Sequence, residues 1–375
     1  MSSPNLKPPV WIASPADLRS MTDRLSHEQR LAIDTESNSL HAFREQVCLI
    51  QFSIPDVDFL VDPLAIKDIS PLSELFVNAR IEKTFHAAEY DLLCLKRDFN
   101  FQVINMFDTM QAARILGYLA VGLNDLLNEF FKINLDKRFQ KADWAKRPLP
   151  ADQLNYARMD THYLLALRDL LETELKQRNL HNLAIEEFQR ISLGNGQSGQ
   201  ESSTWQRMNG ATRLSPSDLA ILKELLDWRF DQAKHMNRPV FKIISDKLLI
   251  AIAETKPNRN EDLLSIGLTS RQTYLFGNDL LSAVRKGRKA PPIKRESTAK
   301  PDLAYLNRLE NLRTWRKNTA QKLGVGSDVV LPRSYMQSIA ERNPQDLASL
   351  SELMPHSPWR LNQYGQGILE CLADK

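Results

Sequence analysis

Apolar residues in the first half of the chain fall into short runs separated by polar turns. Residues 31–35, 47–53 and 57–61 are rich in β-branched or apolar side chains and predict three successive strands. Further short strands are predicted near 82–85 and 104–107, between helical segments, and helices dominate after position 108. This order predicts an α/β domain with a mixed sheet flanked by helices.

The second half of the chain shows helical spacing instead. Ser215 and Pro216 suit the cap and first turn of a helix. Four leucines then recur at helical intervals, namely Leu219, Leu222, Leu225 and Leu226. This part of the chain therefore predicts a short all-α bundle.

A shift of 87 residues aligns two stretches of this helical half with each other. The pairs matched at this offset are Trp228 with Trp315, Arg229 with Arg316, Ala233 with Ala320, Ile252 with Ile339, Ala253 with Ala340, Glu254 with Glu341, Pro257 with Pro344 and Leu263 with Leu350. One inserted residue then restores the matches of Gly277 to Gly365 and Leu281 to Leu369. So many coincidences at one offset predict a duplicated helical domain.

Two stretches have the composition of linkers. Residues 192–204 are Gly, Ser and Gln without an apolar anchor, and residues 285–300 hold seven basic residues, one acid and a Pro pair. These stretches divide the chain into predicted domains at 1–192, 210–288 and 300–375. A length of 375 residues also favours two or three domains over one.

Composition places the chain among ordinary globular proteins, with 42% hydrophobic and 25% charged residues. No apolar run approaches the length of a membrane span, and the polar, Pro-containing start does not match a signal peptide. We therefore expect a cytoplasmic protein without a membrane partner, and a monomer. Cys48, Cys94 and Cys371 lie far apart without zinc-ligand spacing, and we expect reduced, buried thiols.

The net charge of +3 conceals an uneven distribution. Residues 201–375 carry 27 Lys and Arg against 19 Asp and Glu, a net of +8, and residues 1–200 carry 22 against 27, a net of −5. An acidic half joined to a basic half suits an enzyme that holds cations at one end and a polyanion at the other.

The acidic half contains carboxylates at positions that carry chemistry. Asp34 and Glu36 close the first predicted strand, and their i, i+2 spacing puts both side chains on one face. Two like charges side by side are costly unless a cation lies between them. An isolated pair of this kind would be a solvated strand end, so the pair indicates a cation site only if other acids join it in the fold.

The first partner is Asp91, in the early turns of a helix predicted to begin near His86. Glu89 lies close to it and offers an alternative carboxylate. His86 suits either a substrate contact or a hydrogen-bonded residue at a strand–helix junction.

The second partner is Asp160, one helical turn after Tyr156. Asp152 is a candidate cap for this helix, which is predicted to continue through Leu167. In a structural helix Tyr156 would be a core residue and Asp160 a surface charge. Four acids in three segments able to converge argue against that simpler interpretation.

Hard oxygen ligands without a Cys or His cluster suit Mg²⁺ or Mn²⁺, and two such ions about 3.5–4 Å apart can clamp a phosphodiester.

These motifs together resemble a known family. D-T-E, an Asp behind H-x-x-x-x-D, and Y-x-x-x-D resemble the tyrosine-bearing subclass of the DEDD exonucleases. The resemblance narrows to ribonuclease D and the exosome-associated nucleases through CLIQFS at 48–53, NMFDTMQAARIL at 105–116, KADWAKRPL at 141–149 and NYARMDTHYLL at 155–165. It spans roughly 28–170. Behind it, 210–285 and more loosely 305–372 resemble the HRDC domain.

The resemblance implies a ribonuclease H-like fold and a 3′→5′ exoribonuclease that releases nucleoside 5′-monophosphates. It assigns Asp34, Glu36, Asp91 and Asp160 to two divalent cations, Mg²⁺ or Mn²⁺, and makes Tyr156 the residue that positions the attacking water. Its expected substrate is RNA with a single-stranded 3′ end, such as a tRNA precursor.

Other roles stay open on the sequence alone. His86 and Arg147 are the candidate substrate contacts, and Trp144 is expected to give structural support. The second helical copy suits RNA binding or a packing and protein-contact role. The active-site motifs also fit a DNA exonuclease, and a catalytically silent RNA-binding scaffold is the alternative from another class.

Overall fold

The computed structural model describes residues 6–194, 205–294 and 302–373. The described residues fall into two compact units. One unit comprises the described parts of 1–37, 47–198 and 300–375, and the other comprises 38–46 together with the described parts of 199–299.

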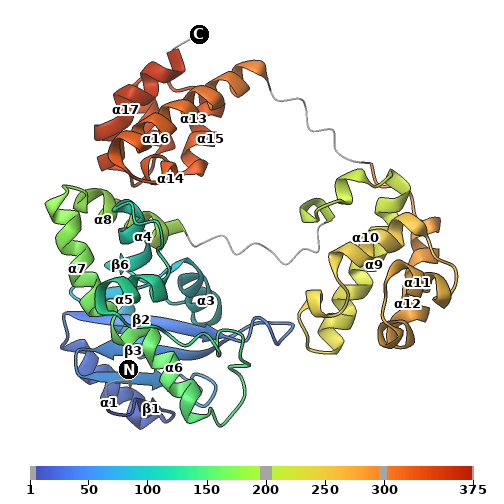
Figure 1. Cartoon of the computed structure of the whole chain (residues 1–375), viewed down its shortest axis with the longest axis horizontal. Coiled ribbons are helices and arrows are strands. Elements are labelled where there is room, and N and C mark those ends of the chain that lie inside the picture. The colour runs from blue at the N-terminus through green and yellow to red at the C-terminus, as the bar shows by residue number, and fades with distance from the viewer. Residues whose placement is uncertain (1–5, 195–204, 295–301, 374–375) are drawn as a thin grey trace. The chain divides into compact units, whose positions relative to one another are not determined.

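The part of the first unit that precedes residue 195 is built on one six-stranded sheet (Figure 1). The strands are β1 (Val10–Ile12), β2 (Arg30–Ser37), β3 (Val47–Ile54), β4 (Val57–Val61), β5 (Glu82–Phe85) and β6 (Met106–Asp108), in the spatial order β1-β4-β3-β2-β5-β6. The β2–β3 and β3–β4 pairs are antiparallel, and the other three pairs are parallel. The predicted mixed sheet is therefore confirmed, with β1 as a strand that the pattern did not indicate.

Helices pack against this sheet, and two of them, α3 and α6, carry candidate site residues. They are α1 (Pro15–Ser26), α2 (Leu72–Val77), α3 (Glu89–Phe99), α4 (Thr109–Ile115), α5 (Leu123–Phe131), α6 (Ala151–His162), α7 (Leu164–Gln177) and α8 (His181–Gly194). Helix α6 crosses β2, β3 and β4, and α7 packs on β2 and β5. Strand β3 is buried along its whole length because it lies inside the sheet and under α6.

The helix predicted from Asp152 through Leu167 is in fact two helices. The chain leaves the first at Tyr163 and starts α7 at Leu164. Pro150 occupies the cap position of α6, so the prediction that Asp152 caps this helix was wrong. Asp152 instead lies in the first turn, where its charge suits the helix dipole.

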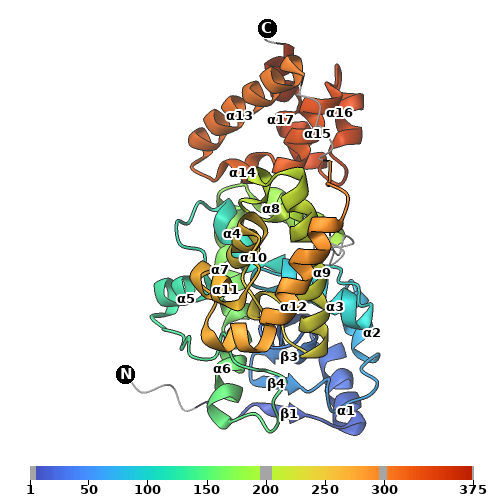
Figure 2. The same cartoon turned by 90° about the vertical axis from the view of Figure 1, so that its right-hand side faces the viewer.

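Two helical modules follow. The first contains α9 (Pro216–His235), α10 (Asp246–Thr255), α11 (Asn260–Ile266) and α12 (Ser270–Lys289), and the second contains α13 (Leu303–Leu323), α14 (Ser327–Val330), α15 (Arg333–Arg342), α16 (Leu347–Leu353) and α17 (Pro358–Ala373). Figure 2 shows the same elements from the side. Short 3₁₀ turns at Trp205–Arg207, Ala211–Arg213 and Val240–Lys242 complete the first module. In the described ranges, no helix has both the length and the apolar character that crossing a membrane requires.

The two modules repeat the same internal contact. Arg229 donates to the carbonyl oxygen of Ile244 at 2.9 Å, and Arg316 donates to that of Leu331 at 3.0 Å, so donor and acceptor are both displaced by 87 residues. Helices α10 and α15 begin and end 87 residues apart, as do α11 and α16. As expected, Ser215 caps α9, in a capping box with Asp218.

Several boundary predictions need correction. Helix α8 extends to Gly194 and α12 to Lys289, so both predicted linkers begin inside helices. Residues 195–204 and 295–300 lie outside the described part of the chain. Cys48 and Cys94 are buried as expected, whereas Cys371 is only half-buried.

The β2–β3 connection, residues 38–46, groups with the first helical module. The Phe43 ring meets the Phe230 ring edge-on at 5.0 Å, and the Phe43 amide donates to the side chain of Asn237.

Candidate active site

Strand β2 presents the first two carboxylates of the site. Pairing of β2 with β5 ends at Ala32, whereas its pairing with β3 continues to Ser37, with a bulge between Glu36 and Ser37. The end of β2 therefore projects past the neighbouring parallel strand. Asp34 and Glu36 lie here, both only partly exposed, and Asp34 accepts a hydrogen bond of 3.2 Å from Gln51 on β3.

Helix α3 brings Asp91 to the same edge. The Asp91 carboxylate accepts hydrogen bonds from the Thr35 amide at 3.1 Å and the Thr35 hydroxyl at 2.5 Å. Because Thr35 lies between Asp34 and Glu36, this contact fixes α3 against the strand that carries both acids.

Helix α6 supplies Asp160, which completes a tight group. One carboxylate oxygen each from Asp34, Glu36 and Asp160 lie within 4.8 Å of one another. Asp91 is not a member of this closest trio, but its charge acts on all three of the other carboxylates.

The electrostatics of the cluster favour a bound cation. Burial and the charges of Asp91, Asp160 and Glu36 raise the pKa of Asp34 well above its ordinary value, and burial, Asp160 and Asp91 do the same to Glu36. Burial also raises the pKa of Asp91 to about 7, despite the Thr35 hydrogen bonds that lower it. Burial and the charge of Asp91 raise the pKa of Asp160 to about 7. These carboxylates oppose one another's ionisation, and divalent cations would relieve that repulsion.

Tyr156 lies one turn before Asp160 on α6. Its ring packs against the rings of Phe139 and Trp144, with centroids 5.8 and 5.9 Å away. Burial and the nearby charges of Asp160 and Glu36 raise the pKa of its hydroxyl above the ordinary value. Tyr156 therefore stays protonated and can donate a hydrogen bond at the edge of the cluster.

Asp108 positions α3 and was not singled out from the sequence. This fully buried carboxylate accepts from the amides of Met110 and Gln111 as the cap of α4. It also accepts from the amides of Ala87 and Ala88, just before α3 begins. Ala87 has a φ of 62°, a left-handed backbone that this hydrogen bond helps to hold. The Asp and Thr of the FDT segment match a helix cap, which is the signal that could have identified this role.

Asp58 on β4 holds the other side of the site. Its buried carboxylate accepts from Ser53 at 2.6 Å, Arg158 at 2.6 Å and His162 at 2.9 Å. The Ser53 hydroxyl also lies 2.7 Å from that of Thr161. Two residues of α6 near Asp160, Arg158 and His162, are thus tied to the sheet through one anion, and Thr161 is tied to it through Ser53.

Replacing Asp58 by Asn should therefore weaken catalysis although Asp58 lies outside the carboxylate cluster. We expect kcat to fall by about 10–100-fold, the effect usual for groups that orient metal ligands. Titration with Mn²⁺ should show weaker binding as well. Asp56→Asn, in the exposed turn before β4, is the matched control and should change neither quantity. Equal effects of the two substitutions would contradict this role of Asp58.

The structure places the two candidate substrate contacts within internal networks. The His86 ring lies 2.9 Å from the Thr109 hydroxyl, and burial lowers its pKa to about 4, so it is neutral at physiological pH. Arg147 forms a two-bond ion pair with Asp62 and also donates to the carbonyl oxygens of Cys48 and Trp144. Contacts of His86 and Arg147 with substrate stay predictions. Trp144 is almost fully buried.

Comparison with known proteins agrees with this architecture. A 3′-5′ exonuclease family model matches residues 9–176, and the HRDC domain model matches 218–284 and 306–372. Ribonuclease D of Desulfotalea psychrophila is 29% identical over 73% of this chain and 74% of its own length. Ribonuclease D of Pseudomonas paraeruginosa is 26% identical over 96% of this chain and 97% of its own length. Human exosome complex component 10 is 29% identical, but the chain spans only 36% of that relative.

Solved structures extend the comparison. Escherichia coli RNase D, described as an exoribonuclease involved in structured RNA processing, shares the fold with a TM-score of 0.72 at 23% identity, over 98% of this chain and 99% of its own. The catalytic core of RRP6 from Trypanosoma brucei matches with a TM-score of 0.65 at 27% identity, over 76% of this chain and 81% of its own. A 3′-5′ exonuclease domain followed by two HRDC domains, in a chain similar to ribonuclease D along most of its length, indicates a 3′-5′ exoribonuclease.

Proposed function

We propose that this protein removes nucleotides from the 3′ end of RNA by hydrolysis and releases nucleoside 5′-monophosphates. The observation that carries the proposal is the convergence of carboxylate oxygens of Asp34, Glu36 and Asp160 within 4.8 Å of one another. The charge of Asp91 raises the pKa of all three. These residues come from β2, α3 and α6, so only the folded chain assembles the group.

The donor set suits two divalent cations, Mg²⁺ or Mn²⁺. Asp34, Glu36, Asp91 and Asp160 would hold them, because hard carboxylate oxygens without thiolate or imidazole are the ligands these ions favour. When bound, such ions lower the pKa of water and stabilise the charge that develops on the departing 3′ oxygen.

The protein's own groups position the reaction. Burial and the neighbouring carboxylates raise the pKa of the Tyr156 hydroxyl, which favours a role as a hydrogen-bond donor that orients the attacking water over a role as its base. Packing of its ring on Phe139 and Trp144 limits the orientations of that hydroxyl. Asp108 and Asp58 hold α3 and α6, and hence Asp91 and Asp160, in register with the sheet.

Tyr156→Phe should reduce kcat by about 100-fold, the lower end of the range for loss of a positioned catalytic group. A hydroxyl that only donates a hydrogen bond should leave the ratio of wild-type to variant rate constant between pH 7 and pH 9. Rates measured at several pH values with saturating RNA would check this. A ratio that rises steeply with pH would mean that the tyrosine acts as a base.

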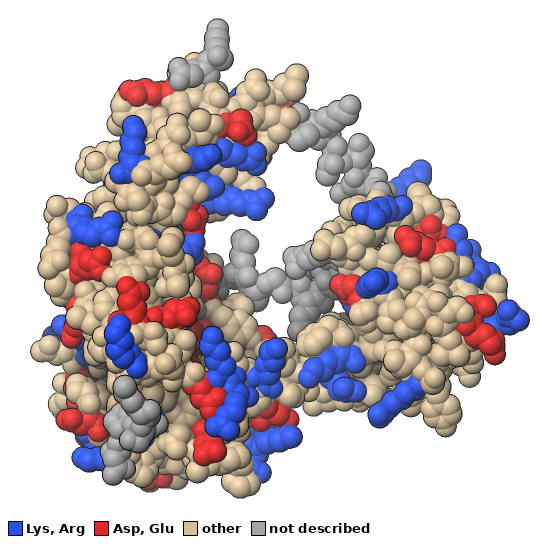
Figure 3. Space-filling view, in the orientation of Figure 1, with Lys and Arg blue, Asp and Glu red and all other residues tan. Residues whose placement is uncertain are grey.

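The substrate is proposed to be RNA with an accessible single-stranded 3′ end, including tRNA precursors. Single strands are usually gripped through backbone phosphates and base stacking, without sequence preference. Lys and Arg side chains are spread over the visible faces of both helical modules, interspersed with Asp and Glu (Figure 3). His86 and Arg147 remain the proposed contacts within the exonuclease domain, and the expected cytoplasmic location and monomeric state stay predictions.

One assay distinguishes the proposal from its rivals. RNA and DNA oligonucleotides labelled at the 5′ or the 3′ end would be incubated with Mg²⁺, and then with EDTA. The proposal expects 5′-labelled RNA to shorten progressively, 3′-labelled RNA to release labelled mononucleotide at once, and EDTA to stop both. Faster degradation of DNA would favour a DNA exonuclease, and RNA binding without degradation would favour a silent scaffold.

A further inference from the structure

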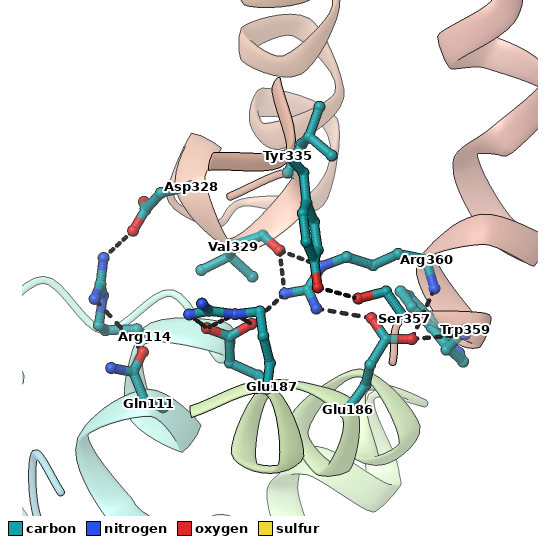
Figure 4. A network of polar contacts seen from close by, with 12 residues as sticks. Gln111, Arg114, Glu186, Glu187, Asp328, Val329, Tyr335, Ser357, Trp359 and Arg360 are labelled. Carbon is teal, nitrogen blue, oxygen red and sulfur yellow. Dashed lines mark hydrogen bonds and ion pairs between the residues drawn. The ribbon is translucent and has the colours of Figure 1, made fainter. Parts of the chain in front are cut away.

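The second HRDC domain docks on the exonuclease domain through a buried ionic network (Figure 4). Arg360 of α17 is 0% exposed and donates to Glu186 and Glu187 of α8, at 2.7 Å each. It also donates to the carbonyl oxygen of Val329. Glu187 receives a second cation, Arg190, at 2.6 Å. The buried guanidinium thus has two carboxylates and a carbonyl oxygen as partners, which offset the cost of burying its charge.

Glu186 also caps a helix that belongs to the other domain. Its second carboxylate oxygen accepts from the amides of Trp359 at 2.6 Å and Arg360 at 3.1 Å, in the first turn of α17. Helix N-termini leave such amides without partners inside the helix, and a carboxylate there also suits the helix dipole. In this case the exonuclease domain provides the cap.

The first HRDC domain shows what this arrangement replaces. Helix α12 is capped internally, because Thr269 accepts from the Gln272 amide and Gln272 accepts from the Thr269 amide. The equivalent positions in the second copy, after its one-residue insertion, are Ser357 and Arg360. Ser357 donates instead to the Tyr335 hydroxyl. The position that completes the capping box in the first copy, Gln272, therefore carries the docking residue Arg360 in the second.

Further contacts surround this network. Val329 joins the apolar core of the exonuclease domain, and Arg114 of α4 forms an ion pair with Asp328 of α14. Gly117 and Gly324 approach so closely that a Cβ on Gly117 would collide with the Gly324 carbonyl oxygen.

We infer that the second HRDC domain is a fixed structural partner of the exonuclease domain, held by Glu186 across the domain boundary. The first copy retains a self-contained cap and has Gln272 where the second has its docking arginine. The duplicated domains have therefore taken different roles.

Amide hydrogen exchange of the full-length protein tests this inference. Arg360→Met keeps most of the side-chain volume and removes the charge. We expect exchange in the first turn of α17 and in α8 to accelerate by about tenfold or more, the scale of a lost cap and charge pair. Exchange in α12 should not change. Thr269→Ala is the matched control, and it should accelerate the first turn of α12 alone.

A second variant guards against general misfolding. Glu186→Gln keeps an acceptor oxygen for the α17 amides and removes the ion pair, so it should produce a smaller acceleration confined to α8 and α17. Unchanged α17 protection in both variants would overturn the inference. Equal loss of protection in α12 and α17 would also overturn it, because the effect would then be on folding in general.

Discussion

Asp91→Asn is expected to reduce the rate of RNA hydrolysis by about 10³-fold, the equivalent of roughly 4 kcal/mol of lost transition-state stabilisation. The substitution removes a charge that the site needs to hold cations, while a side-chain oxygen remains for the Thr35 amide and hydroxyl. RNA affinity should change little, because single-strand binding depends on surfaces outside the carboxylate cluster. Rates under single-turnover conditions, together with binding measured in the presence of EDTA, would check both expectations.

Glu89→Gln is the matched control for this prediction. Glu89 lies two residues earlier in the same helix and is exposed. It is the acid that the sequence alone could confuse with Asp91. The control should hydrolyse RNA at the wild-type rate. Normal activity of Asp91→Asn, or equal losses in the two variants, would contradict the assignment.

The metal-free protein should lose stability as the pH rises from about 4 to about 7. The pKa values of Asp91 and Asp160 are about 7 in the folded protein, against an ordinary value of 3.8. Between these values the folded state holds protons that the unfolded state has released, so a rise in pH favours unfolding, and the loss is complete above pH 7. A shift of about 3 pKa units corresponds to roughly 4 kcal/mol for a single group.

Asp160→Asn isolates this effect from the other titrating groups. Without metal, the variant should be more stable than the wild type at pH 8, with a melting temperature higher by about 10 °C, and the difference should shrink toward pH 4. Adding Mg²⁺ at pH 8 should stabilise the wild type much more than the variant, because the ion favours the folded site. Thermal denaturation in EDTA and in Mg²⁺ would measure both quantities. A variant less stable than the wild type in EDTA at pH 8 would refute the proposed repulsion.

The sheet could be predicted because the composition of its strands is distinctive. Residues 47–53 and 57–61 are almost continuous apolar runs, and they form β3 and β4. Strand β1 was missed because it has only three residues, directly after a Pro pair, which is too few to show an alternation of apolar and polar side chains. The break at Tyr163 was missed because the leucines after it continue the spacing of α6.

The carboxylate cluster could be predicted because each acid has a recognisable local position. Asp34 and Glu36 lie at the end of a strand, Asp91 lies early in a helix, and Asp160 follows Tyr156 by one helical turn. The groups that hold it could not be predicted, because they act over long sequence separations. Asp58 pairs with Arg158 and His162, and Thr35 with Asp91, and no local pattern marks such contacts. The basic run after 285 suggested a linker, yet its first residues end α12, because charged side chains suit the exposed face of a helix.

Anomalous diffraction from crystals of the full-length protein soaked with Mn²⁺ would test the metal site most directly. We predict two manganese peaks bounded by Asp34, Glu36, Asp91 and Asp160, and their loss in the Asp34→Asn variant. Crystals that show no peak among these four carboxylates, at Mn²⁺ concentrations that support RNA hydrolysis, would contradict the proposed metal-dependent mechanism.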